Sequence, residues 1–283
     1  MIIDTHAHVN FQAFDKDRDE VMNRAAENKT AMILVGANYK SSLKAAEMAN
    51  KYPNTFAAVG LHPTHLTEQV FEEEGGKIFA KAEKFDLSAF EELALNVDVK
   101  AIGECGLDYY HLNPNIPFEE QKKLQKQVFS AHLELAHRQN LPLLLHCRSE
   151  KEGSSAAYED MLSVLRSSRA RPRGVLHCFS ADWETAKQFL SLGFYLGFNG
   201  IITYSKSVDL LEVIRRIPKH RILSETDCPY LTPVPFRGKR NEPIYVEYVI
   251  EKIAQVREIS YESAAKLTLS NAKKLFHLEI ASN

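Results

Sequence analysis

Two histidines lie close together near the start of the chain, in the stretch Asp-Thr-His-Ala-His. His6 and His8 are two residues apart, and residues i and i+2 of a β-strand point to the same face. The pair can therefore bind one metal ion from a single strand. Asp4 has the same parity but lies earlier in the segment, so we expect it to orient an imidazole rather than bind the ion.

Further ionisable residues follow apolar segments at intervals along the chain: His62, Glu104, His146, His177 and Asp227. A single histidine after an apolar segment is usually an ordinary hydrogen-bonded residue. Here, however, five of the eleven histidines occupy such positions, together with two carboxylates. Burying so many titratable groups together costs several kcal/mol unless they are paired or bind metal. The coincidence favours a metal site.

Six of these side chains form the predicted ligand set: His6, His8, Glu104, His146, His177 and Asp227. We assign the first two and Asp227 to one ion, and the other two histidines to a second ion. Glu104 can bridge the ions, because a carboxylate has two oxygens. Imidazole ligands favour Zn²⁺, Mn²⁺ or Fe²⁺ over Mg²⁺, although the choice among these four stays open. Two ions ~3.5–4 Å apart suit in-line displacement at phosphorus.

A cysteine directly follows four of the predicted ligands: Cys105, Cys147, Cys178 and Cys228. A zinc cluster is one interpretation of four cysteines. Because neighbouring residues of a strand point to opposite faces, however, each cysteine should point outward when the ligand before it points inward. We therefore favour packing of small side chains between the strands and the surrounding helices.

Eight apolar segments alternate with eight helical patterns. The predicted strands are 2–4, 31–37, 56–62, 99–105, 141–147, 174–179, 194–198 and 221–227. The predicted helices are 16–28, 40–51, 77–95, 117–140, 155–168, 182–192, 206–217 and 243–257. This alternation predicts a (β/α)₈ TIM barrel with its active site at the carboxyl ends of the strands. A doubly wound open sheet is the alternative, but HAHVNF stands where its glycine-rich loop is usual.

The whole chain, residues 1–283, reads as one barrel domain, with extra C-terminal helix packed outside it from about residue 259 to 283. Hydrophobic residues make up 45% of the chain and charged residues 25%, and the net charge is −2. These values neither favour nor exclude nucleic acid as a ligand. We find no membrane-spanning run, signal peptide or disulfide framework, so we expect a cytoplasmic monomer without an obligate protein partner.

One arginine-rich segment, RSSRARPR at 166–173, has the composition of a DNA-binding patch. It precedes the sixth predicted strand and should therefore lie at the amino end of the barrel, away from the predicted ligands. We favour a solvated loop.

An ordered set of motifs resembles the TatD family of metal-dependent deoxyribonucleases. The motifs are DTHAH (4–8), GLHP (60–63), AIGECGLDYY (101–110), LHCR (145–148), LHCFS (176–180), SETDCPYLTP (224–233), RGKRNEP (237–243) and SNAKKLF (270–276). The resemblance implies a metal-dependent hydrolase barrel, DNA phosphodiesterase activity and the six metal ligands named above. The chain departs from the family pattern at Ser149-Glu150, at Ser224 and in the long segment 67–98. The first departure predicts a loop of different shape at 149–157, which we expect to form a lip over the substrate.

The resemblance also supports a mechanism. Asp227 and Glu104 are the predicted catalytic residues, and Asp227 would accept the proton of a metal-bound water. His62 would hydrogen-bond a phosphate oxygen.

Four further residues are predicted to contact the substrate. The guanidinium forks of Arg240 and Arg148 suit phosphate, although a structural ion pair is the alternative for Arg148. Asp108 and Tyr109 would line the pocket. An exposed tyrosine there can stack on a base, whereas a buried one would only pack the loop.

The sequence therefore predicts a divalent-metal-dependent deoxyribonuclease with DNA as its substrate, such as a 3′–5′ exonuclease or a repair nuclease. A metal-dependent amidohydrolase or esterase acting on a small molecule is the alternative. A nucleic-acid-binding protein without catalysis is a third class, but pure binding needs no such ligand cluster.

Overall fold

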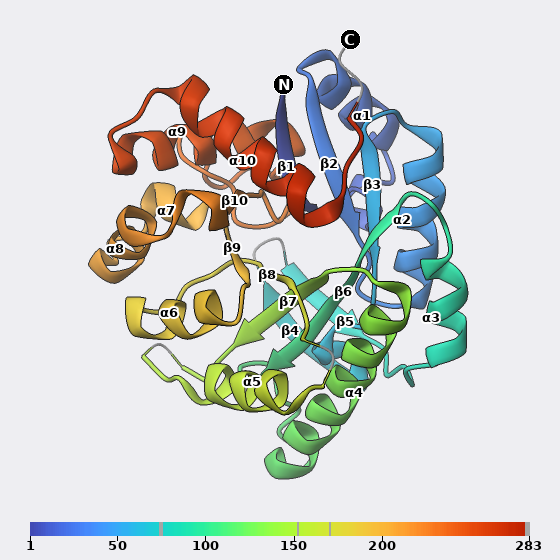
Figure 1. Cartoon of the computed structure of the whole chain (residues 1–283). Coiled ribbons are helices and arrows are strands. Elements are labelled where there is room, and N and C mark those ends of the chain that lie inside the picture. The colour runs from blue at the N-terminus through green and yellow to red at the C-terminus, as the bar shows by residue number, and fades with distance from the viewer. Residues whose placement is uncertain (74–75, 152, 170, 281–283) are drawn as a thin grey trace.

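The central sheet has eight parallel strands, arranged as a barrel in the computed structural model, which describes residues 1–73, 76–151, 153–169 and 171–280 (Figure 1). In spatial order the strands are β1 (Ile2–Ala7), β2 (Thr30–Val35), β3 (Thr55–Val59), β6 (Val99–Asp108), β7 (Leu143–Arg148), β8 (Gly174–Leu176), β9 (Tyr195–Phe198) and β10 (Ile222–Ser224). Each strand pairs with the next in parallel register. The predicted barrel is therefore observed.

The last strand meets the first at a short seam. A single bridge pairs Ala7 with Cys228, and the His8 amide donates to the Cys228 carbonyl at 2.8 Å. Side chains extend this seam, because the Ser224 hydroxyl donates to the Ile3 carbonyl and the Thr5 hydroxyl donates to the Ser224 carbonyl, each at 3.2 Å. Ser224, which departs from the family pattern, thus has a structural role in closing the barrel.

Helices surround the sheet (Figure 1). They are α1 (Arg18–Glu27), α2 (Tyr39–Lys51), α3 (Leu87–Ala94), α4 (Phe118–Gln139), α5 (Ala156–Ser167), α6 (Trp183–Ser191), α7 (Ile201–Tyr204), α8 (Val208–Arg216), α9 (Val246–Arg257) and α10 (Tyr261–Phe276). Short 3₁₀ turns occupy Gln12–Phe14, Pro63–Leu66, Lys219–Arg221 and Pro243–Tyr245. None of the helices in the described ranges is long and apolar enough to cross a membrane.

One predicted helix is wrong in part. The range 77–95 was expected to be helical, but it begins in a two-stranded antiparallel hairpin formed by β4 (Gln69–Glu73) and β5 (Gly76–Ala80). The helix α3 starts only after Asp86, whose carboxylate accepts from the Ser88 and Ala89 amides at 3.0 and 3.2 Å. This N-cap sets the helix start, because it satisfies amides that have no partner within the helix.

The C-terminal helix α10 does more than pack outside the barrel. Its residues Ala272, Leu275 and Phe276 belong to the same apolar cluster as Ile3 of β1 and Leu223 of β10. Figure 1 shows α10 crossing beside these two strands. The helix therefore closes one end of the barrel interior.

The arginine-rich segment lies where the sequence placed it, apart from residue 170, which lies outside the described residues. It joins α5 to the amino end of β8, and the Arg173 carbonyl accepts from the Leu143 amide at the start of β7, at 2.8 Å. In the loop predicted to form a lip, the Ser149 hydroxyl accepts from the Ala157 amide at 3.2 Å, which ties the loop to α5. Residue 152 of that loop also lies outside the described residues.

Candidate metal centre

The first predicted ligand group is assembled from the two ends of the chain. His6 lies on β1 and His8 just beyond it, with their Nε2 atoms 3.1 Å apart. Asp227 follows β10, and its Oδ1 atom lies 3.6 Å from His6 Nε2 and 3.3 Å from His8 Nε2. Two ligands about 2.1 Å from one tetrahedral ion would lie ~3.4 Å apart. These three donors therefore have the spacing that a single ion requires.

Glu104 of β6 directs its two carboxylate oxygens to two different groups of imidazoles. Its Oε2 atom lies 3.4 Å from His6 Nε2 and 3.7 Å from His8 Nε2. Its Oε1 atom lies 2.7 Å from His177 Nε2 and 3.1 Å from His146 Nδ1. His146 Nδ1 and His177 Nε2 are themselves 3.2 Å apart. The arrangement thus offers a second group of donors that shares one carboxylate with the first.

The hydrogen bonds of the outer ring nitrogens of His8 and His146 indicate whether these side chains suit a metal ion. His8 Nδ1 lies 2.9 Å from the Val35 carbonyl, and His146 Nε2 lies 3.0 Å from the Asp108 carboxylate. Such acceptors hold the ring proton on the outer nitrogen, which leaves a lone pair on the nitrogen facing the centre. Imidazole nitrogens and carboxylate oxygens are ligands for Zn²⁺, Mn²⁺ and Fe²⁺. The side chains therefore fit divalent ions at this position.

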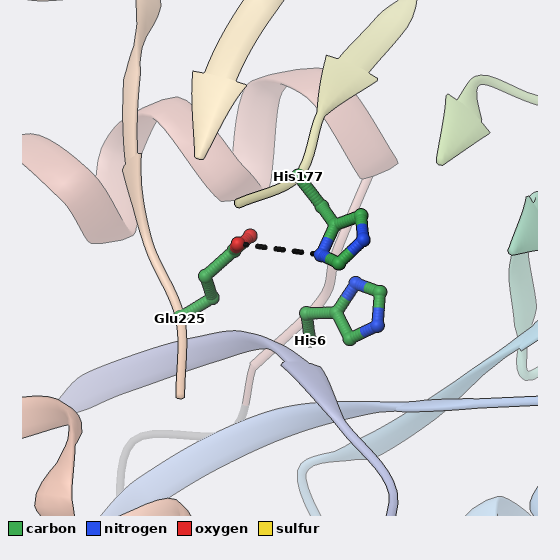
Figure 2. Close-up of side chains that lie close together, drawn as sticks. All are labelled: His6, His177 and Glu225. Carbon is green, nitrogen blue, oxygen red and sulfur yellow. Dashed lines mark ion pairs between the residues drawn. The ribbon is translucent and has the colours of Figure 1, made fainter. Parts of the chain in front are cut away.

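Glu225 is a fully buried carboxylate that we did not predict from the sequence. Figure 2 shows it directed at His177, with Oε1 3.6 Å from His177 Nδ1, and the His6 ring stacked on that histidine at a centroid distance of 4.0 Å. The Cys178 amide also donates to Oε1, at 2.5 Å. A Cβ atom at residue 197 would lie 2.3 Å from Glu225 Oε2, so Gly197 leaves the space that this side chain occupies.

The alternation of side chains along the last strand could have identified Glu225 from the sequence. It lies two residues before Asp227 and two after Leu223, an interior residue, so all three should face inward. Glu225, His6 and His177, which Figure 2 shows close together, form one further group able to hold a metal ion.

Burial and neighbouring charges together set the pKa values of the side chains at the centre. Burial by itself raises the pKa of Glu104, but the surrounding imidazoles, with His177 foremost, hold it well below its ordinary value. Burial lowers the pKa of His6, and proximity to His177 lowers it further. Burial opposes protonation of His177, yet Glu104 and Glu225 raise its pKa well above the usual value. An ion bound there would displace this proton, so metal affinity should fall at low pH.

The prediction that Asp4 orients an imidazole is wrong, because its carboxylate binds backbone amides instead. Its Oδ1 atom accepts from the His6 amide at 3.1 Å and from the Thr226 amide at 2.8 Å. The carboxyl group thus ties the backbone of β1 to the segment after β10. Burial raises its pKa well above the usual value for an aspartate. Asp4 supports the centre through the backbone that carries the ligands.

Two predicted substrate contacts, His62 and Asp108, lie at the centre itself. His62 Nε2 is 3.5 Å from Glu104 Oε1, which places this ring among the second group of donors. Asp108 lies below His146, and its Oδ2 atom also contacts His111 Nδ1, at 2.9 Å. Its side chain is fully buried. Asp108 lines the pocket, as predicted, and it is also placed to position His146.

The loop after β6 presents a different tyrosine from the one we expected. Tyr109 is buried, and its hydroxyl donates to Asp160 at 2.6 Å, so it lies against helix α5 and does not line the pocket. The neighbouring Tyr110 is 54% exposed and stacks on the Arg148 guanidinium, 4.0 Å from the ring centre. Arg148 itself lines the pocket. Tyr109 therefore follows the packing alternative, and the exposed aromatic ring of this loop is Tyr110.

Arg240 does not line the pocket over the metal ligands, but it lines a larger cavity beside that pocket. Its guanidinium forms two hydrogen bonds with the Asp17 carboxylate, at 2.8 and 2.6 Å, and lies 3.3 Å from Glu242. It also covers the Phe14 ring. In this structure the fork that was expected to bind phosphate is engaged by carboxylates. The reason is tertiary, because Asp17 lies 223 residues away in sequence.

Two of the four cysteines pack in the apolar core as predicted, and the other two lie nearer the metal pocket. Cys105 and Cys228 are buried in the apolar core between strands and helices. Cys147 and Cys178 border the pocket over the metal ligands, which has a volume of about 360 Å³. All four are free thiols, and none belongs to a potential metal-binding group in the described part of the chain.

A (β/α)₈ barrel with histidines and carboxylates gathered at the carboxyl ends of its strands is the architecture of metal-dependent hydrolases. Residues 3–277 match the model of the family described as TatD related DNase, and the chain belongs to this family.

Relatives support this assignment along the whole chain. An uncharacterized metal-dependent hydrolase of Bacillus subtilis, YabD, is 39% identical over 98% of this chain and 100% of its own length. A protein of Escherichia fergusonii named 3′-5′ ssDNA/RNA exonuclease TatD is 32% identical and covers 97% of this chain and 98% of its own. The structure of YjjV, a TatD homologue from Escherichia coli, superposes with a TM-score of 0.82 at 27% identity and covers 98% of each chain.

Proposed function

We propose that this protein is a divalent-metal-dependent nuclease that hydrolyses phosphodiester bonds of single-stranded DNA. The observation that carries the proposal is Glu104, whose two oxygens each face a separate group of imidazole nitrogens. A bridging carboxylate of this kind suits a pair of ions that together neutralise a phosphodiester. The relative named as a 3′-5′ ssDNA/RNA exonuclease supports this substrate class and the direction of cleavage.

Bound divalent ions would supply Lewis acidity and would lower the pKa of a coordinated water. In the proposal, His6, His8 and Asp227 would hold one ion and His146 and His177 would hold the other, while Glu104 would serve both groups of ligands. The Asp227 carboxylate accepts the proton of the attacking water, because an oxygen not used for metal binding can act as a general base. Neighbouring imidazoles, with His8 foremost, lower its pKa despite burial, which keeps it ionised.

Two further residues would handle the phosphate. His62 donates to a phosphate oxygen from its place beside Glu104. Burial lowers the pKa of His62 well below its ordinary value, so the neutral ring would donate one hydrogen bond without adding a positive charge. Arg148, stacked on Tyr110 at the pocket wall, is the proposed guanidinium contact. Arg240, which Asp17 and Glu242 hold, lines the adjoining cavity, so its proposed phosphate contact would lie beyond the metal pocket.

We further propose that the protein acts in the cytoplasm as a monomer. Its four cysteines are free thiols, as is usual in a reducing compartment.

The test is cleavage of end-labelled single-stranded DNA, duplex DNA and RNA, with Mn²⁺, Zn²⁺, Fe²⁺, Mg²⁺ or a chelator, alongside a panel of small esters, lactones and amides. The Glu104→Ala variant should lose metal and at least about 100-fold in nuclease activity. Glu134→Ala, which removes an exposed carboxylate of α4, is the control and should keep both. Hydrolysis of a small molecule without nucleic-acid cleavage would favour the amidohydrolase or esterase alternative. Full activity of Glu104→Ala would contradict the bridging role.

A further inference from the structure

A second, larger cavity adjoins the pocket over the metal ligands. Its volume is about 1440 Å³, above the ~300–1,000 Å³ of usual small-molecule pockets. Both cavities are lined by Phe11, Ala37, His65 and Tyr230, so the larger one continues outward from the proposed reaction centre. A ligand bound at the metal ions can therefore extend into it.

Cations predominate among the charged residues that line this cavity, and they are Lys40, Lys44, Arg237, Lys239 and Arg240. Lys40 and Lys44 lie four residues apart on α2 and therefore share one face of the helix. Lys239 lines the same cavity from the segment after β10, whereas Asp15 is the one acidic residue among the lining residues that the structure describes. Asp15 lies 3.2 Å from Lys44, but neither Lys40 nor Lys239 forms an ion pair with any residue that the structure describes. A chain with a net charge of −2 thus has a positive groove beside its candidate centre.

The β4–β5 hairpin adds an aromatic ring to the rim. Phe79 lines the cavity and is 61% exposed. The segment that follows the hairpin is fixed next to α2, because Glu83 Oε1 accepts from the Tyr39 amide at 3.0 Å. The preceding side is held by Gln69, which donates to the Thr64 carbonyl at 2.9 Å. These contacts keep an exposed phenyl ring in the same groove as Lys40.

We infer that this groove, defined by Lys40, Lys44, Phe79 and Lys239, holds the strand of nucleic acid next to the scissile phosphate. The lysines contact backbone phosphates, and Phe79 stacks on a base. This inference rests on the proposed nuclease function and makes it more specific. A positive groove with an exposed aromatic ring is the usual arrangement for single strands, because only an unpaired base offers its face for stacking. The preferred substrate is therefore an unpaired strand several nucleotides long.

Comparison of a short and a long substrate tests the inference. Bis(p-nitrophenyl) phosphate reaches only the metal pocket, whereas a twelve-nucleotide oligothymidylate would also occupy the groove. Phe79→Ala should lower kcat/KM for the oligonucleotide roughly tenfold and leave hydrolysis of the small diester unchanged. Tyr261→Ala, which removes an exposed aromatic ring of α10 that lines neither cavity, is the matched control. It should change neither rate.

The dependence of oligonucleotide binding on salt concentration tests the phosphate contacts of the lysines. The double variant Lys40→Glu and Lys239→Glu should weaken binding of the oligonucleotide, measured by fluorescence anisotropy in a chelator. It should also make log Kd less dependent on log salt, by about 0.7 for each lost phosphate contact. Lys274→Glu, an exposed charge of α10, is the control.

The outcomes separate this inference from the proposed function. If the wild type hydrolyses the small diester and the oligonucleotide, but Phe79→Ala and the lysine variant match their controls, the groove assignment is wrong and the nuclease stands. If the wild type cleaves neither, the proposed function fails. In that case, oligonucleotide binding that is unaffected by the groove variants would reject the groove as well. Weaker binding by both variants would support it as a single-strand site.

Discussion

Asp108 illustrates how single residues below the ligands prepare the candidate centre. Its Oδ2 atom lies 3.0 Å from His146 Nε2, and its Oδ1 atom accepts from the His111 amide at 2.8 Å. Burial alone would raise the pKa of this carboxyl, but hydrogen bonds from His111 and His146 hold it well below the usual value. An ionised Asp108 keeps the His146 proton on Nε2 and leaves Nδ1 able to bind metal.

Asp108→Asn should weaken binding of the second ion by about 10–100-fold. The amide group would donate to His146 Nε2 and move the ring proton to Nδ1, the atom that faces Glu104. Competition with a chromogenic chelator measures the affinity. Asp160→Asn, which alters a carboxylate bound to Tyr109 outside the centre, is the control. Equal affinities in the two variants would contradict the role of Asp108.

His132 is a second buried residue that acts at a distance from the ligands. Its Nε2 atom accepts from the Leu61 amide at 3.0 Å and so holds the segment that carries His62. Burial lowers the pKa of His132 to about 4. The folded protein therefore keeps this ring neutral, whereas the unfolded chain gains a proton below about pH 6.5. The free energy of unfolding should fall as the pH drops from about 6.5 toward 4.

At pH 5 this residue should reduce the free energy of unfolding by about 2 kcal/mol relative to pH 7.5. His132→Gln can still accept from Leu61 but does not titrate, so its pH dependence should be smaller by that amount. Urea unfolding at both pH values in a chelator measures the difference. An unchanged pH dependence in the variant would show that His132 does not contribute.

At the scale of elements, α10 and the β4–β5 hairpin are both additions to the eight-stranded barrel, and they lie at different places on it. The helix places apolar residues against the interior of the barrel, where Phe276 is 1% exposed. The hairpin rises from the carboxyl end of β3, the end that also carries His62. One addition therefore stabilises the barrel, and the other shapes the surface beside its candidate centre.

Phe276→Ala should lower the free energy of unfolding by about 3–5 kcal/mol, because it leaves a cavity beneath the strands. Denaturant unfolding measures this loss. Tyr261→Ala on the same helix removes a ring that is 36% exposed and should cost less than about 1 kcal/mol. Similar losses in both variants would mean that α10 packs on the barrel without closing it.

At the scale of the whole molecule, the candidate centre joins distant parts of the chain. Its ligands come from β1, β6, β7, the end of β8 and the segment after β10. Ions bound to these side chains would connect the first strand to the last across a seam where, among the described residues, one backbone bridge joins Ala7 to Cys228. Metal binding should therefore stabilise the complete barrel.

Addition of Zn²⁺ or Mn²⁺ at 100 times its Kd should raise the free energy of unfolding by about 2.7 kcal/mol, if the unfolded chain does not bind the ion. Thermal unfolding before and after dialysis against a chelator measures this effect. Glu104→Ala should lose most of the stabilisation, and Glu134→Ala should retain it. A melting temperature of the wild type that is insensitive to both chelator and metal would contradict the predicted ligand set.

The sequence alone determined the barrel and the positions of its six expected ligands. Both follow from local regularities. Apolar segments that alternate with helices specify parallel strands, and parity along a strand specifies which side chains face inward. His6, His8 and Glu104 were therefore identifiable without coordinates, and the same rule marks Glu225.

Only the tertiary structure decided which residues the longer side chains contact. Arg240 pairs with Asp17 where it lines the groove, Tyr110 rather than Tyr109 is exposed, and the hairpin brings Phe79 to the groove beside Lys40. Local periodicity cannot predict these contacts, because each depends on segments that are far apart in sequence and that meet only when the barrel closes.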